Sequence, residues 1–143
     1  MDAYGYTHYM FGQTYNSIHD ELHLLEFRIG LIDYGIKPAI RHKLILQLAT
    51  AKSSLVKNKK FIKQVNATKN FPLFYIFKSF LETKQPIISF PEYYHQFIKH
   101  VPSMTTMDRE NGLIYFQVYA NDFVEFISMA HTMHNIKILL GDK

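Results

Sequence analysis

Between positions 38 and 65, apolar residues recur with the period of an α-helix. They follow one another at steps of three, four or seven residues, the spacing of one helix face, and are Ile40, Leu44, Leu48, Ala51, Leu55, Ile62 and Val65. Pro38 suits the first position of such a helix, because a proline lacks the N–H group that the first turn leaves unpaired. The pattern predicts a long amphipathic helix in the middle of the chain.

The same region carries a large excess of positive charge. No Asp or Glu occurs from Tyr34 to Leu81, whereas ten Lys or Arg residues do, although the net charge of the whole chain is only +4. If no break occurs near positions 53, 54 or 58, part of this charge forms a second stripe beside the apolar one, made of Arg41, Lys52, Lys59 and Lys63. An unneutralised stripe of this kind attracts phosphates and releases their counterions.

We therefore expect a small, non-enzymatic nucleic-acid-binding or accessory protein that contacts phosphates through this helix face. The residues expected to make the contacts are Arg41, Lys52, Lys57, Lys59, Lys60, Lys63 and Lys69. The alternative is a protein-interaction module, such as an inhibitor, adaptor or immunity-type protein of a phage or mobile element, that binds an acidic protein surface. Electrostatic attraction does not depend on which molecule carries the negative charge.

The expected fold is a single α+β domain over residues 1–143, with a mainly helical body of four to five helices. Further helices are expected at about 17–32, 72–84 and 91–100. The stretch LIYFQVYA at 113–120 has the composition of a strand, and so does IKILL at 136–140; the helix between them completes a small βαβ unit. An N-terminal strand would place Tyr4, Tyr6, His8 and Met10 on one side and join this sheet.

The order of elements from 72 to 120 also resembles that of the winged-helix family. The helices 72–84 and 91–100 would form a helix-turn-helix, and a turn at MDRENG (107–112) followed by LIYFQVYA would begin the hairpin wing. The resemblance implies that the second helix enters the major groove of DNA. A winged-helix-like fold is therefore the alternative architecture.

A pair of histidines raises the question of a metal site. His19 and His23 are four residues apart on the expected helix 17–32, as two zinc ligands would be. The segment HDELH is similar to the zincin pattern HExxH, but Asp20 stands where the general-base Glu belongs, and no third ligand is identifiable. We interpret both as surface or partly buried histidines, and expect no metal, no cofactor, no catalytic residue and no enzymatic activity.

Location and assembly follow from composition. The chain has no Cys, no long apolar segment and no basic, apolar start typical of a signal peptide, so a cytoplasmic protein that does not engage a membrane is expected. The helix 72–84 is apolar nearly all round, which places it in the core or in the interface of a homodimer.

Overall fold

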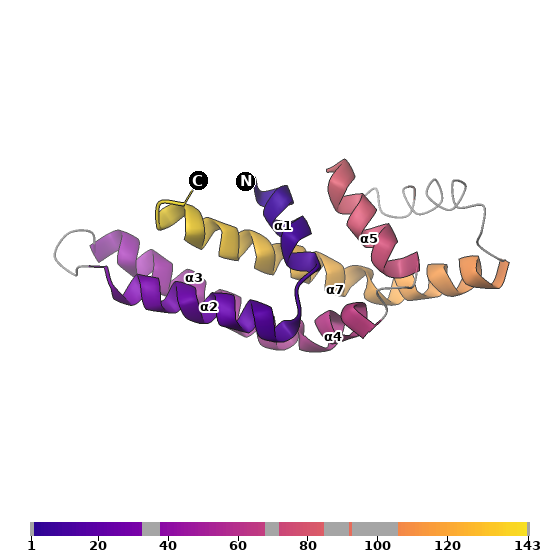
Figure 1. The fold of residues 1–143 in the computed structure, drawn as a ribbon, viewed down its shortest axis with the longest axis horizontal. Helices are drawn as coiled ribbons and strands as arrows, with labels where there is room; N and C mark the ends of the chain where they lie inside the picture. The colour runs from indigo at the N-terminus through magenta and orange to yellow at the C-terminus, as the bar shows by residue number, and fades with distance from the viewer. Residues whose placement is uncertain (1, 33–37, 68–71, 85–91, 93–105, 143) are drawn as a thin grey trace.

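The fold is seen in a computed structural model that describes residues 2–32, 38–67, 72–84, 92 and 106–142. These residues form six α-helices and contain no strand (Figure 1): α1 (Ala3–Phe11), α2 (Tyr15–Gly30), α3 (Pro38–Lys57), α4 (Lys59–Ala67), α5 (Pro72–Thr83) and α7 (Thr106–Leu139). The predicted α+β fold is therefore wrong for the described part of the chain. None of these helices combines the length and the apolar character needed to cross a lipid bilayer.

Helices α2 and α3 lie side by side and run in opposite directions (Figure 1). α2 begins after Thr14, whose hydroxyl accepts a hydrogen bond from the Ser17 amide at 3.1 Å and so caps the helix. It buries the apolar face formed by Ile18, Leu22, Leu25 and Ile29, and α3 buries Leu44, Leu48, Ala51 and Leu55. The helices expected at 17–32, from Pro38 and at 72–84 are thus present, with shifted ends.

The long helix α7 is the centre of the packing. It contacts each of the other five described helices, most extensively α3 and α1, and Figure 1 shows it extending along the longest axis of the molecule. Its buried side chains recur at steps of three or four residues and include Phe123, Phe126, Ala130, Met133 and Ile136. This spacing keeps one face of α7 on the core over four turns.

The core next to α7 is rich in phenylalanine. The rings of Phe77 and Phe123 stack with centroids 4.3 Å apart, and those of Phe11 and Phe74 stack at 5.2 Å. Phe11 also meets Phe123 edge to face at 5.3 Å. These contacts join α1, α5 and α7 into one aromatic cluster, which agrees with the expectation that the helix 72–84 contributes to a core.

The predicted N-terminal strand is wrong, because residues 3–11 form α1. The carboxylate of Asp2 accepts a hydrogen bond from the Gly5 amide at 2.7 Å and caps the helix. Tyr6 and Met10 are buried together. A separation of four residues returns to the same side of both a strand and a helix, so the aromatic alternation did not discriminate between them.

The predicted C-terminal βαβ unit is also wrong. The two expected strands, 113–120 and 136–140, and the expected turn at 107–112 lie almost wholly within α7, which ends at Leu139. Ile136 is fully buried as part of the helical series of α7. The intrinsic preference of β-branched and aromatic residues for strands is weak and is overridden here by packing against five helices.

The winged-helix alternative fails for the same reason. Its wing requires strands, and the segment expected to provide the first one is helical. The second helix of the motif was expected at 91–100, which, apart from Glu92, lies outside the described residues.

Candidate nucleic-acid interface

The predicted central helix is broken at Asn58. α3 ends at Lys57, and α4 begins at Lys59. Asn58 is buried, and its side-chain amide donates a hydrogen bond to the carbonyl of Ser54 at 2.8 Å, whereas its Oδ1 has no hydrogen-bond partner among the described residues. The lysines before and after this residue therefore belong to two helices.

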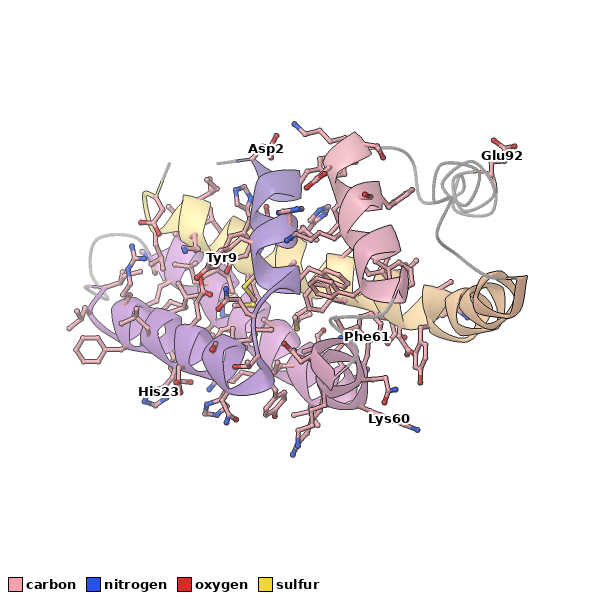
Figure 2. The ribbon with its side chains drawn as sticks, turned by 45° about the vertical axis from the view of Figure 1, so that its right-hand side comes forward. Asp2, Tyr9, His23, Lys60, Phe61 and Glu92 are labelled. Atoms are coloured by element: carbon pink, nitrogen blue, oxygen red, sulfur yellow. The ribbon has the colours of Figure 1, made fainter. Side chains whose placement is uncertain are left out.

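The outer face of α4 carries three lysines. Phe61, Ile62 and Val65 are buried, and the opposite side presents Lys59, Lys60 and Lys63, all exposed. Figure 2 shows Lys60 reaching away from α4 and its neighbour Phe61 lying inside the molecule. Because residues three and four apart are neighbours on a helix, the three ammonium groups share one surface. We call the exposed lysines of α4, together with Lys57 at the end of α3, the α4 lysine surface.

The other predicted contact residues are not part of the α4 lysine surface. Arg41 is partly buried near the start of α3. Lys52 faces α2 and forms an ion pair with Glu26, and the hydrogen bond from Lys52 lowers the pKa of that carboxyl. Lys69 lies outside the described residues. The structure thus brings together four of the seven predicted residues.

Several of the described carboxylates pair with basic residues outside the lysine-rich region. Both Asp142 oxygens accept hydrogen bonds from Arg28 at 2.9 Å, and this interaction lowers the pKa of Asp142. Further ion pairs join Glu21 to Lys137 at 3.2 Å and Asp2 to Lys84 at 2.9 Å, and His8 Nε2 lies 3.1 Å from a carboxylate oxygen of Glu82.

The positive charge of the α4 lysine surface is therefore not neutralised by the carboxylates that the structure describes. Within the described part of the chain, Lys57, Lys60 and Lys63 form no ion pair with any carboxylate. Lys59 is held differently, because its ammonium lies 5.2 Å from the centroid of the Tyr15 ring in a cation–π contact. Four of the ten cations that the sequence concentrates between 34 and 81 thus lie exposed on this surface.

A cavity of about 280 Å³ opens between α2 and α3 next to the lysine surface. Its apolar lining comes from Leu22, Leu55 and Val56, and its polar lining from Tyr15, His19, His23 and Lys52. Figure 2 places His23 on the same lower side of the molecule as Lys60. We call this feature the α2–α3 cavity.

The two histidines expected on one helix face do line the same cavity, but no metal site follows from this. Among the residues that the structure describes, no three His, Cys, Asp or Glu side chains are grouped so that they could hold a metal ion. The nearest carboxylate to His19 is Asp20, at 3.7 Å. Within the described residues, the fold therefore brings no third metal ligand to the two histidines of HDELH.

Sequence reasoning missed Tyr15 and Val56 as part of the site. Tyr15, His19 and His23 follow one another at four-residue steps, so a helix from Tyr15 places them along one side facing α3. This signal was present in the sequence, but the helix was expected to begin two residues later. Nothing in the sequence indicates a role for Val56, because this residue lines the cavity only through the packing of α3 against α2.

No protein-family model, no curated protein and no solved structure matches this chain.

Proposed function

We propose that this chain binds nucleic acid through its phosphates, and that the α4 lysine surface makes the contacts. The observation that carries the proposal is the face of α4, where three lysines are exposed together and none forms an ion pair with a carboxylate among the described residues. Phosphate oxygens are the ligands such a surface attracts, and binding them releases counterions from the nucleic acid.

The arrangement of these lysines also supports a binding role. Like charges three and four residues apart destabilise a helix by about 0.2–0.5 kcal/mol per pair. Lys63 has such neighbours in both Lys59 and Lys60, and α4 has only nine residues in which to offset the repulsion. A polyanion bound along the outer face of α4 would offset this repulsion, because its negative charges attract the lysines.

The salt dependence of binding tests the proposal. If Lys57, Lys59, Lys60 and Lys63 each neutralise one phosphate, log K should fall against log salt with a slope of about −3.6 for a duplex and about −2.8 for a single strand. Fluorescence anisotropy with labelled oligonucleotides measures the slope. A slope near zero, or no binding at low salt, would contradict the proposal.

Single lysine variants locate the contact. Lys60→Gln and Lys63→Gln should each weaken binding and make the duplex slope shallower by about 0.9. The matched control is Lys43→Gln, which removes the same charge from an exposed lysine about 21 Å along α3 from Lys57. An equal effect in all three variants would show that net charge alone, and not the α4 lysine surface, governs binding.

A second candidate function is docking to an acidic protein. One observation favours it: Leu24, Phe27 and Leu31 are exposed on the face of α2 opposite the core, with Phe27 63% and Leu31 71% accessible. Exposed apolar groups beside charged ones are common at protein interfaces. Indifference to DNA at low salt, combined with salt-sensitive binding of one acidic protein, would favour this function over nucleic-acid binding.

A further inference from the structure

We propose that the α2–α3 cavity receives one unpaired nucleotide of a single-stranded nucleic acid, whose flanking phosphates lie on the α4 lysine surface. This inference rests on the proposed function and makes it more specific, because it assigns a preference for single strands over duplex. A base in a duplex is stacked and paired, so only an unpaired base is free to enter a cavity.

The lining suits an aromatic ring attached to an anion. Leu22, Leu55 and Val56 offer an apolar wall for the faces of a base, and the Tyr15 ring adds an aromatic group. The polar edge is formed by His19, His23 and Lys52, each of which carries at least one N–H donor. Apolar walls with a few polar groups at one edge are typical of small-molecule sites in proteins.

The size of the cavity limits the ligand to a small one. Its volume of about 280 Å³ lies just below the range of about 300–1,000 Å³ that is usual for pockets holding drug-sized ligands. It therefore accommodates a single nucleotide unit and not a dinucleotide.

The cavity is continuous with the lysine surface. Tyr15 lines the cavity, and the ammonium of Lys59 lies over the same ring at 5.2 Å. A strand with one base between α2 and α3 would thus pass a neighbouring phosphate close to Lys59, which gives the cavity and the charged surface a common ligand.

Histidine variants separate the cavity from the charged surface. His19 and His23 are both exposed, so His19→Ala/His23→Ala changes the cavity edge without opening the core or altering α4. The matched control is His42→Ala, an exposed histidine of α3 outside the cavity lining. Affinities are measured by anisotropy for a single-stranded oligonucleotide of about 16 nucleotides and for a duplex of equal length.

We expect the unaltered protein to bind the single strand more tightly than the duplex, and the double histidine variant to lose about fivefold or more in single-strand affinity with unchanged duplex affinity. A mononucleotide gives a direct second readout: titration with adenosine 5′-monophosphate should shift the imidazole NMR resonances of His19 and His23, and inorganic phosphate should shift them less.

Two results overturn the inference, and they are distinguishable. If both nucleic acids bind and the histidine variant binds each as tightly as the unaltered protein, the cavity is not used, but the proposed function stands. If neither nucleic acid binds at low salt, the proposed function fails and the inference fails with it.

Discussion

The ammonium of Lys59 lies over the ring of Tyr15, 5.2 Å from its centroid, so the first residue of α4 is held against the first residue of α2. Cation–π contacts at exposed sites stabilise by about 0.5–1 kcal/mol. The contact fixes where the positive face of α4 begins relative to the α2–α3 cavity. It also means that Lys59 has a structural role that Lys60 and Lys63 lack, so the latter two are the better positions for testing binding.

Removing charge from α4 should stabilise the folded chain while weakening its binding. Lys63→Gln relieves repulsion from Lys59 and Lys60, which is worth about 0.2–0.5 kcal/mol per pair. Urea unfolding at low salt should show a higher midpoint, and the gain should shrink in about 1 M salt, where the Debye length falls to about 3 Å. Lys43→Gln, with no charged residue three or four positions away, should show no such gain; a loss of stability in Lys63→Gln would contradict the repulsion argument.

The aromatic cluster should dominate the stability of the fold. Phe123→Ala removes a fully buried ring that stacks on Phe77 and should lower the free energy of unfolding by about 3–5 kcal/mol. Phe27→Ala removes the same atoms from a ring that is 63% exposed, and should change the free energy of unfolding by no more than about 0.5 kcal/mol. Chemical denaturation of both variants measures the difference, and similar losses would show that Phe123 is not the core residue described here.

The ion pair between Arg28 and Asp142 should contribute stability that acid removes. The hydrogen bonds from Arg28 lower the pKa of Asp142 below its ordinary value of 3.8, so the folded state favours the ionised carboxylate. The contribution is present above pH 3.8 and is lost as the pH falls through the lowered pKa. Asp142→Asn should therefore be less stable than the unaltered protein at pH 7, with the gap closing in acid.

Asp122→Asn is the control for this comparison, since Asp122 lies on α7 and has no ion pair among the described residues. Its melting temperature should follow that of the unaltered protein at each pH. If the difference in stability between Asp142→Asn and the unaltered protein persists unchanged at low pH, the charge of Asp142 does not have the role described.

His131 should make the fold sensitive to mild acid. Burial, and then the neighbouring His134, lower the pKa of His131 below 6.5, and its Nε2 is buried with no hydrogen-bond partner in the part of the chain that the structure describes. The neutral ring is favoured in the folded state, so stability is full above pH 6.5 and declines as the pH falls through the lowered pKa. His131→Gln should reduce this decline between pH 7.5 and 5.5, measured by urea midpoints, and His42→Ala should leave it unchanged.

The central part of the fold could be predicted from the sequence. The periodic apolar residues of α2 and α3, Pro38 at the start of α3 and Pro72 at the start of α5 are local signals, and each marks a helix that is present. The clustering of Lys59, Lys60 and Lys63 also follows from helical spacing alone. These features depend on interactions within one or two turns, which is why the sequence suffices for them.

The rest depends on contacts between distant segments. Residues 113–120 have strand-like composition, yet they continue a helix of 34 residues whose partners lie far away in the chain. Gly112 was expected to close a turn, but a glycine costs a helix only about 1 kcal/mol, which tertiary packing offsets. The break at Asn58 and the α2–α3 cavity likewise arise from how helices meet.

The central position of α7 has a consequence for how the chain folds during synthesis. The five described helices that precede it leave the ribosome first, yet the aromatic cluster cannot close until Phe123 and the residues after it have been made. Nascent chains that stop short of α7 therefore expose the rings of Phe11, Phe74 and Phe77, which makes them targets for chaperones and proteases. Completion of the molecule should thus be a single late event, because translation of the last described helix supplies the surface on which all the earlier ones assemble.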